Sequence, residues 1–490
     1  MEIPEWVLKH KKRGTEIHVK KSGYYLYKVT SKRDPVKKRP KKITEKYLGV
    51  ITREGVIPSK HERVIQSMKN ITTKEFGATW FILENNKNIM ELLRTLYPHA
   101  WKEILVFSVF RLLYNSPIKN LLDYYSTSFI SETINNAHMS PKRIGNLLYE
   151  LGKEREKIKM FLHHFISGTE FAVIDLTHVF SFSENIISAT LGYNSEEEFI
   201  PQVNLVFIFS LDNHSPAYFR MIPGSVRDVS SLLLTVKESE VENVVLIGDK
   251  GFYSEDNVKD LGELRKEIER KLEKLEEGEI RYILPLKRNI SLIDYGKLKK
   301  GDRREFDGFF KFEKRAIWHY SYSLDEKKKI VVYLDEKLKA EEEKDYLLRI
   351  EDDDKESLEK FFKKQYCLGT ISVITNLQEN AARIYELLKC RIEIENLIDT
   401  FKNILNADRT YMRDDYQMEG WMFINFIALV FYYRIYRLLV DNKLLNNYSP
   451  HDVLIHFSRI HKLKIGDKWL TSEIPKKTRK IIEKLSLRIT

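Results

Sequence analysis

Residues 171–180, FAVIDLTHVF, decide how the middle of this chain folds. They form a short run rich in β-branched and aromatic residues, as expected for a strand that is buried on both faces of a sheet. The first part of this run, FAVID, ends in Asp175, and a second such run, VVLIGD at 244–249, ends in Asp249. Between the two, residues 203–212 and 217–223 predict an antiparallel strand pair, and residues 227–239 predict a helix. The predicted order is therefore strand, two hairpin strands, helix, strand.

This order is that of a ribonuclease H-like α/β core, a mixed sheet flanked by helices in which the first and fourth strands lie side by side. Asp175 and Asp249 stand at corresponding places of those two strands. An aspartate at a strand end is commonly a turn or helix-capping residue. The fold order instead predicts that the two carboxylates lie close together.

A third acid is expected from a helix far downstream, RIEIENLIDTFK at 391–402. At 100° per residue, one stripe of this helix is apolar and should face the sheet. Arg391, Glu395 and Lys402 cluster within about 40° on one border of the stripe, whereas Glu393 lies about 160° from Glu395. We therefore predict Glu395, and not Glu393, as the third acid. The alternative is an ordinary Arg–Glu pair on a surface helix.

Three converging carboxylates favour a site for two Mg²⁺ or Mn²⁺ ions, because hard cations prefer oxygen ligands. Two such ions about 3.5–4 Å apart serve phosphodiester cleavage. Asp175, Asp249 and Glu395 are the predicted catalytic and metal-binding residues, and Arg391 and Lys402 the predicted phosphate contacts. His178 is either a metal or phosphate contact or a residue with a local structural role.

Four segments resemble the DDE transposases of bacterial and archaeal insertion sequences, in the group with a Tyr-Arg-Glu-Lys signature. They are IDLTHVFSFS (174–183), MIPGSVRDVSSL (221–232), IGDKGFYS (247–254) and the stretch 384–429. The signature places Arg three residues after Tyr, Glu four after Arg and Lys seven after Glu.

Arg391, Glu395 and Lys402 fit the signature's spacing, but its Tyr position is Leu388, with Tyr385 one turn earlier. A second departure is Ser225, where the group usually has Asn. Neither departure falls on an expected metal ligand.

The resemblance implies an enzyme that cleaves element ends and joins the 3′-hydroxyl to target DNA. Its implied partners are the terminal inverted repeats and target DNA, and its implied assembly is a homodimer on paired ends, since each chain carries one triad. Two alternatives stay open. One is a ribonuclease H-like nuclease without strand transfer, and the other is a domesticated transposase that only binds DNA.

Changes in the sequence pattern along the chain predict several domains, with an insertion in the core. The insertion is expected to be β-rich, with Lys287, Arg288 and Trp318 as candidates for clamping a DNA strand or stacking a base, although an aromatic residue in a strand usually belongs to a core. A strand near 281–286 is assigned either to the insertion or to the core. The predicted parts are a basic N-terminal β unit that contacts DNA (1–57), a helical domain for DNA-end binding (58–168), the first part of the core (169–258), the insertion (259–376), the second part of the core (377–440) and a C-terminal helical region (441–490).

The net charge of +11 is concentrated near the N-terminus. Residues 9–46 contain 15 Lys or Arg against three acids, so the remaining chain is near −1. Such a basic arm favours a nucleic-acid backbone as partner, the alternative being a solvated tail.

The expected compartment is the cytoplasm, in association with the nucleoid. The two cysteines, Cys367 and Cys390, cannot support a disulfide framework, and the first residues lack the apolar run of a signal peptide. Residues 421–433 are apolar but shorter than a membrane span, so we predict a buried helix and no membrane partner.

Overall fold

The computed structural model forms two compact units. Unit 1 comprises residues 1–78, 127–129 and 455–490, and unit 2 the rest of the chain. The residues that the structure describes are 3–33, 39–61, 63, 71–115, 117–192, 194, 198–226, 229–240, 245–247, 281–350 and 355–489.

The N-terminal part of unit 1 is a small antiparallel sheet preceded by a short helix, α1 (Glu5–Leu8). Val7 of this helix packs with Leu26 and Ile51 of the sheet to form a small apolar core. The strands lie in chain order: β1 (Thr15–Lys20), β2 (Gly23–Arg33), β3 (Pro40–Thr52) and β4 (Gly55–Pro58).

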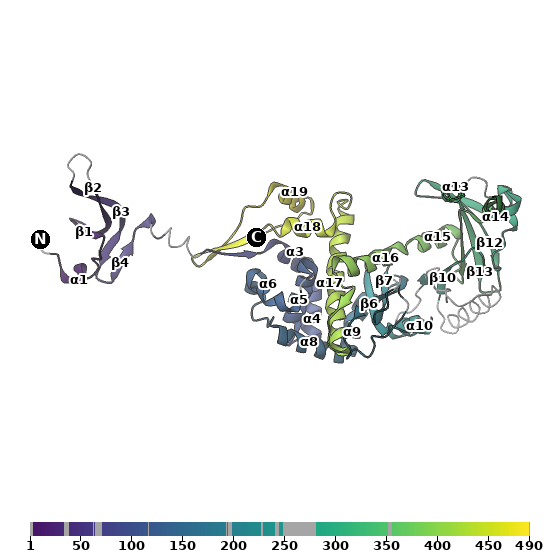
Figure 1. The fold of residues 1–490 in the computed structure, drawn as a ribbon, viewed down its shortest axis with the longest axis horizontal. Helices are drawn as coiled ribbons and strands as arrows, with labels where there is room; N and C mark the ends of the chain where they lie inside the picture. Colours follow the sequence, from purple (N-terminus) through teal and green to yellow (C-terminus); the bar gives the residue numbers. More distant parts are fainter. Residues whose placement is uncertain are drawn as a thin grey trace. The chain divides into compact units, whose positions relative to one another are not determined.

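A second sheet of unit 1 combines one strand from the N-terminal part of the chain with two strands from its C-terminal part. β5 (Thr72–Glu75) pairs with β16 (His461–Ile465), which pairs with β17 (Lys468–Thr471). In Figure 1 these are the purple strand and the two yellow strands beside it. The helices α18 (Pro450–Phe457) and α19 (Lys476–Lys484) flank the two yellow strands in the sequence. The C-terminal region is thus part sheet, whereas we expected helices alone.

Unit 2 contains a cluster of helices packed around one long helix, α17 (Asp415–Asp441). α8 begins at Pro141 after an extended Ser140, as the sequence predicted. α8 and α17 touch backbone to backbone, because a Cβ atom added to Gly420 would overlap the carbonyl of Leu148, and one added to Gly152 would overlap that of Tyr416. Besides α17, the cluster consists of α3 (Gly77–Glu84), α4 (Lys87–Leu96), α5 (Trp101–Tyr114), η1 (Ile118–Asn120), α6 (Leu121–Thr127), α7 (Ile130–Thr133), α8 (Pro141–Lys153) and α9 (Arg155–Ile166).

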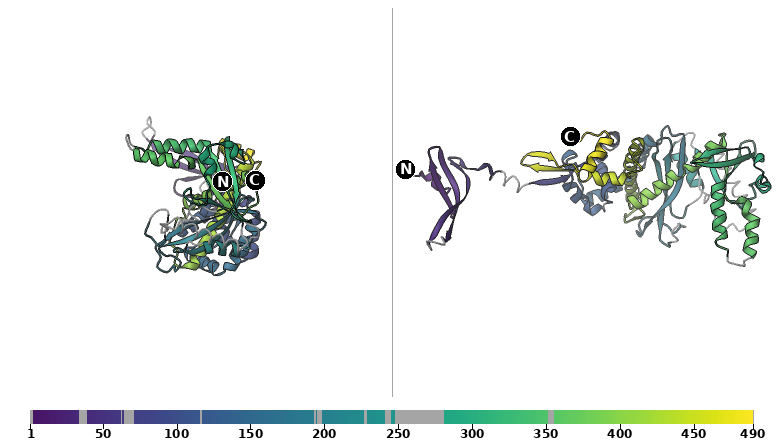
Figure 2. Two further views of the ribbon diagram at one scale, coloured as in Figure 1. Left: turned by 90° about the vertical axis from the view of Figure 1, so that its right-hand side faces the viewer. Right: turned by 90° about the horizontal axis from the view of Figure 1, so that it is seen from above.

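α17 is the one helix of the described chain that is long and apolar enough to cross a membrane by length and composition. Most of its apolar residues between Met418 and Leu439 are buried within unit 2. Figures 1 and 2 show it between the helical cluster and the sheet of this unit. It therefore forms a core helix, as predicted for residues 421–433.

The sheet of unit 2 has the strand order β8-β7-β6-β9-β10. β6, β9 and β10 are parallel to one another, β7 is antiparallel to them, and β8, which is antiparallel to β7, runs in the same direction as β6. The ribonuclease H-like fold class is thereby confirmed, with the first and fourth strands side by side. The strands are β6 (Phe171–Ser181), β7 (Gln202–Ser210), β8 (Ser215–Pro223), β9 (Val245–Ile247) and β10 (Arg281–Leu286), and α10 (Val229–Glu238) precedes β9.

The strands expected in the insertion extend this same sheet. β14 pairs with β10, and β13, β12 and β11 follow outward. The strand at 281–286 therefore belongs to the core sheet. The elements of this region are α12 (Gly296–Lys300), η3 (Arg303–Glu305), β11 (Gly308–Phe312), β12 (Arg315–Ser323), β13 (Lys329–Asp335), α13 (Glu336–Leu347), α14 (Lys355–Lys364), η4 (Gln365–Cys367) and β14 (Thr370–Thr375).

The chain then returns along the sheet through helices. These are α15 (Ala381–Lys389), α16 (Ile392–Asp399) and a π-helical turn, η5 (Thr400–Ile404), followed by β15 (Arg409–Thr410), which pairs with the end of β6.

Candidate active site

Asp175 lies in the middle of β6, two residues after Val173, the last residue of β6 that pairs with β9 in the described part of the chain. The parallel register joins Phe171–Val173 to Val245–Ile247. On its other side Asp175 is paired with Phe207 of β7. The Asp175 side chain keeps 25% of its surface exposed. The carboxylate can therefore reach solvent from an otherwise buried sheet.

α16 lies over this part of the sheet because its apolar stripe packs there. Ile394 and Leu397 are buried, and the ring of Phe401 contacts the ring of Phe207 with centroids 5.4 Å apart. Since Phe207 is paired with Asp175, this packing places the α16 segment beside that aspartate. The stripe predicted from the sequence is the face that meets the sheet.

Arg391 joins the two acids that the structure describes. Its guanidinium lies 2.9 Å from Oε1 of Glu395, one turn along the helix, and 3.7 Å from Oδ2 of Asp175. The Glu395 side chain is 45% exposed. One cation thus holds two carboxylates that come from distant parts of the chain.

Glu393 occupies a different environment from Glu395. Burial raises the pKa of Glu393, and His214 partly opposes that shift. Glu395 contacts Arg391 directly and through it shares a partner with Asp175.

Lys402 lies in the π-helical turn and contacts His178. The N–H of Leu405 donates to the carbonyl of Thr400 (3.0 Å), a five-residue step that defines the turn. Nζ of Lys402 is 3.2 Å from Nε2 of His178. An ammonium can only donate, so this imidazole nitrogen accepts. The regular 100° helix that we assumed beyond Asp399 is therefore interrupted, and turns of this kind are frequent at functional sites.

A buried arginine holds the end of this turn. Arg111 of α5 donates to the carbonyl of Leu405 (2.5 Å) and to Oδ1 of Asn425 (3.0 Å). Burial lowers its pKa to about 10. The positive charge sits at the carboxyl end of the helical segment, where the helix dipole favours a cation. Arg111 thereby fixes the end of the segment that carries Glu395 and Lys402.

The sequence pattern of the family described as "Transposase DDE domain" matches residues 167–431, more than half of the chain. The chain belongs to the transposase DDE domain family. The matched DDE domain begins just before β6 and ends within α17, so it contains Asp175 and Glu395.

No curated protein matches the chain. One similar solved structure is a cryo-EM structure of the piggyBac transposase synaptic complex with hairpin DNA. It has a TM-score of 0.38 and 12% sequence identity, and the match covers 73% of this chain and 70% of that chain.

Asp249, the remaining acid of the predicted triad in this DDE domain, lies outside the described residues. In the part of the chain that the structure describes, no group of three or more His, Cys, Asp or Glu is placed to hold a metal ion. The assignment of Asp249 stays a prediction. The oxygen donors of Asp175 and Glu395 are of the kind that Mg²⁺ and Mn²⁺ prefer.

The three residues predicted to contact DNA from the outer part of the DDE domain differ in their surroundings. Arg288 forms a two-pronged pair with Glu342 (2.8 and 2.9 Å) and donates to the carbonyl of Thr370 (3.0 Å), contacts that stabilise the local fold. Trp318 is half-buried and packs against the ring of Phe309. Lys287 is half-buried at the end of β10. These DNA contacts stay predictions.

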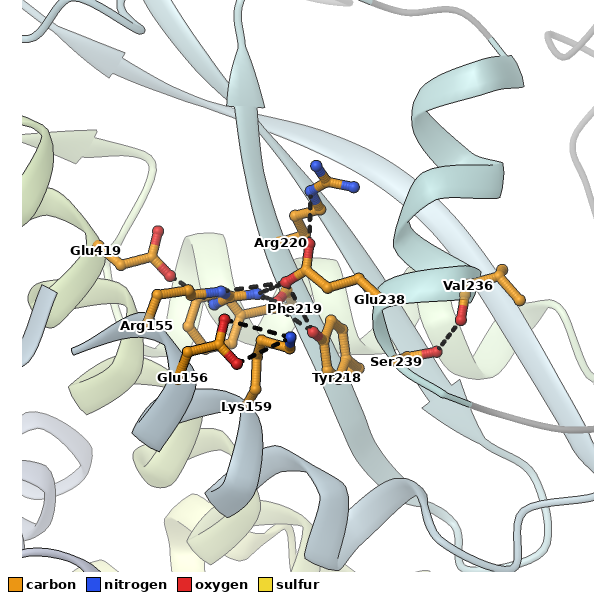
Figure 3. Close-up of polar contacts among 10 residues, drawn as sticks. All are labelled: Arg155, Glu156, Lys159, Tyr218, Phe219, Arg220, Val236, Glu238, Ser239 and Glu419. Carbon is orange, nitrogen blue, oxygen red and sulfur yellow. Dashed lines mark hydrogen bonds and ion pairs between the residues drawn. The ribbon is translucent and has the colours of Figure 1, made fainter. Parts of the chain in front are cut away.

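A second charged cluster joins α9, α10 and α17 to the sheet of unit 2 (Figure 3). Arg155 of α9 pairs with Glu419 of α17 (2.5 Å) and with Glu238 of α10 (2.8 Å). Tyr218 of β8 donates to Glu238 (2.9 Å), and Arg220 lies 3.1 Å from it. We call these five residues the Arg155 cluster. All of them except Tyr218 line a cavity of about 380 Å³, together with Glu156, Lys159 and Met221.

The charges of the Arg155 cluster depend on one another. Burial raises the pKa of Glu419. Burial also acts to raise that of Glu238, but the hydrogen bond and charge of Arg155 outweigh it, so the pKa of Glu238 is lowered. Arg155 is thus the residue on which both acids rely.

Sequence reasoning missed Arg111 and Arg155, because their partners are distant in the chain. Arg111 did leave a signal, since it is a charge inside the apolar run ILVFSVFRLLY. A cation there needs a buried acceptor. Which acceptor it finds is decided by tertiary packing alone.

Proposed function

We propose that this chain is a transposase that cleaves DNA at the ends of a mobile element and joins the freed 3′-hydroxyl to target DNA. The observation that carries the proposal is the shared contact of Asp175 and Glu395 with Arg391, within a transposase DDE domain. The resemblance to the group with the Tyr-Arg-Glu-Lys signature supplies the roles proposed for Arg391 and Lys402.

The proposed metal ligands are Asp175, Glu395 and Asp249. Val173 is paired with Ile247, and in the sequence Asp175 and Asp249 each follow their paired residue by two positions. This equal offset supports including Asp249. Two Mg²⁺ or Mn²⁺ ions held there would neutralise the phosphodiester, activate a water or 3′-hydroxyl and stabilise the leaving oxygen.

Arg391 then has two successive partners. Without a divalent ion it neutralises the carboxylates of Asp175 and Glu395. If a metal ion were held by those carboxylates, Arg391 would no longer be needed to neutralise them, and its guanidinium would be available for a bidentate contact with a DNA phosphate. Lys402 lies beside His178 on the same helical segment, and its proposed role is to hold a second phosphate as a point charge.

Substituting the acids tests this proposal directly. Asp175→Asn and Glu395→Gln should each lower cleavage of an element end by more than about a hundredfold, because metal ligation supplies several kcal/mol of charge stabilisation. Binding of the same DNA in a mobility-shift assay should persist. Glu393→Gln is the matched control and should cleave normally. Normal cleavage by Glu395→Gln together with loss in Glu393→Gln would overturn the site.

Strand transfer is tested separately from hydrolysis. A pre-cleaved element end with a free 3′-hydroxyl, mixed with a target plasmid, should yield joined products that Glu395→Gln does not form. Cleaved ends without joined products would favour the nuclease alternative. Absence of cleavage in the unaltered chain with Mg²⁺ or Mn²⁺ would favour a DNA-binding protein descended from a transposase.

The proposed partners are element ends and target DNA, with the basic residues 9–46 contacting the phosphate backbone and two chains assembling on paired ends. Deleting residues 1–48 should flatten the salt dependence of DNA binding, by about 0.9 in log–log slope for each lost phosphate contact. Mixing this deletion with Glu395→Gln should restore cleavage if binding and catalysis act in trans. A single chain on cleavage-competent paired ends in light scattering would refute the dimer. The cytoplasm, at the nucleoid, is the proposed compartment.

A further inference from the structure

The basic charge of this chain is concentrated in unit 1, which includes both of its ends. Unit 1 contains 30 Lys or Arg against 11 Asp or Glu, whereas the rest of the chain has 52 against 60. Residues 455–490 alone contribute 10 basic residues and three acids. Residues 455–490 are thus a second basic segment. The net charge outside residues 9–46 is near zero because an excess of acidic residues in unit 2 balances this segment.

The second basic segment folds so that lysines gather on one face of the sheet β5-β16-β17. Lys462 is paired with Lys74 on β5, and Lys464 is paired with Trp469 on β17. Paired residues of neighbouring strands point to the same face, as do residues two apart on one strand. Lys74, Lys462, Lys464 and Trp469 therefore share a face, which we call the lysine face.

Aromatic rings support the lysines of this face. Nζ of Lys464 and Nζ of Lys74 lie 5.7 and 6.0 Å from the centre of the Trp469 ring, so each ammonium is within reach of its π face. Nζ of Lys462 lies 4.5 Å from the ring of Phe76 and donates to the hydroxyl of Thr471 (2.9 Å). These contacts order side chains that are otherwise flexible, which lowers the entropy lost when they bind a ligand.

The same face carries a like-charge pair that costs stability. Lys462 and Lys74 stand directly opposite each other on antiparallel strands, an arrangement that is destabilising in sheets. Burial also lowers the pKa of Lys462. An anion bound across the two strands would offset both effects, since it favours the charged form of each lysine.

α19 in the same unit is basic on its outer side. Thr478, Ile481 and Ile482 are buried. The exposed positions of this helix carry five cations and one acid: Lys476, Lys477, Arg479, Lys480, Lys484 and Glu483. An unshielded positive surface of this kind attracts a polyanion over a distance set by the ionic strength.

We propose that the lysine face binds the phosphate backbone of double-stranded DNA, as a contact additional to the N-terminal arm. The inference rests on the proposed function for its choice of polyanion. It follows from ordered ammonium groups at regular cross-strand positions, in a unit whose charge surplus comes from both chain ends. Lysines bind phosphates as point charges without reading bases, so the contact is independent of sequence.

The salt dependence of DNA binding tests the lysine face. In a full-length Glu395→Gln background, which removes cleavage, Lys74, Lys462 and Lys464 are replaced together by Gln. The slope of log K against log salt should become shallower by about 2 to 3, since each phosphate contact contributes about 0.9. The loss should be equal for an element end and an unrelated duplex. The matched control replaces Lys337, Lys344 and Lys363 on α13 and α14 of unit 2, and its slope should be unchanged.

Two further variants guard against a folding defect. Lys464→Arg keeps the charge and should keep the slope, whereas Lys464→Gln should lose about 0.9 of it. An unchanged slope in the triple variant overturns the inference. If, in addition, light scattering shows a changed oligomeric mass, the lysine face is a self-association surface instead. Because every readout is binding in a cleavage-dead background, failure of the proposed catalysis leaves this result interpretable.

Discussion

Replacing Arg155 by Met should destabilise unit 2 by about 3 kcal/mol. Removing one partner of a buried ion pair costs about 3–5 kcal/mol, and we expect the lower end because 24% of the Arg155 side chain is exposed. Met keeps an unbranched apolar stem but loses the guanidinium, which lies over the ring of Phe219 with its central carbon 5.2 Å from the ring centre. The change therefore removes the charge shared by Glu238 and Glu419 without introducing a larger or branched side chain.

The loss should depend on pH in a defined direction. The folded-state pKa of Glu238 is lowered, so its stabilisation is present above its unfolded value near 4.5 and is lost as the pH falls through the folded value. The folded-state pKa of Glu419 is raised, so its contribution declines as the pH rises from 4.5 through that raised value. Without Arg155 both acids resist ionisation. The penalty of Arg155→Met should accordingly be larger at pH 7.5 than at pH 5.

Calorimetry and urea unfolding of the full chain at the two pH values provide the assay. Lys159→Met on the same helix is the control, since its partner Glu156 is 82% exposed and their ion pair should contribute less than about 1 kcal/mol. Adding Glu419→Gln to Arg155→Met should recover part of the loss. A penalty below 1 kcal/mol, or one equal at both pH values, would refute the reasoning.

Three other substitutions have expected outcomes. Arg111→Met should reduce the cleavage rate at saturating DNA by about tenfold or more without changing DNA affinity. The reason is that the end of η5 loses a charged hydrogen-bond donor worth about 1.5–3 kcal/mol. An unchanged rate in a quenched-flow assay would show that Arg111 does not support the site. Arg391→Gln should bind Mn²⁺ about two- to fivefold more tightly by calorimetry, since an exposed ion pair worth about 0.2–1 kcal/mol no longer competes for the carboxylates; weaker Mn²⁺ binding would contradict this. Gly420→Ala should lower the free energy of unfolding by about 2 kcal/mol or more, because the added Cβ would overlap with Leu148. Gly145→Ala is the control and should be neutral or stabilising by up to about 1 kcal/mol, since its Cβ would meet only a side-chain nitrogen 3.8 Å away. Similar urea midpoints for the two variants would contradict the prediction.

The core of the fold was predictable because its strands are buried on both faces. Runs such as FAVIDL contain the apolar pattern of a central strand, and their order with the intervening helix determines which strands become neighbours. The choice of Glu395 over Glu393 also followed from local geometry, since it depends on the first turns of a regular helix. Both inferences use information contained in a few consecutive residues.

What could not be predicted depends on pairing across long distances. Residues 461–471, HKLKIGDKWLT, alternate around a Gly466-Asp467 turn and do resemble a hairpin, but the third strand of that sheet, β5, lies near the other end of the chain. The π-helical turn at Lys402 likewise departs from the constant 100° step on which helix-face arguments rely. Arg111 finds its acceptor at Leu405 only when α5 and η5 pack together.

The position of α17 in the chain has a consequence for biosynthesis. This helix is the most apolar long element of the described chain, yet it leaves the ribosome after α5, α8 and β8, the elements against which it packs. Its docking surface can thus be assembled before the helix is made, which shortens the time for which an apolar segment long enough to span a bilayer is exposed during translation. A circular permutant that begins at α17 would reverse this order, and the nascent chain would present its most hydrophobic stretch with no partner yet synthesised.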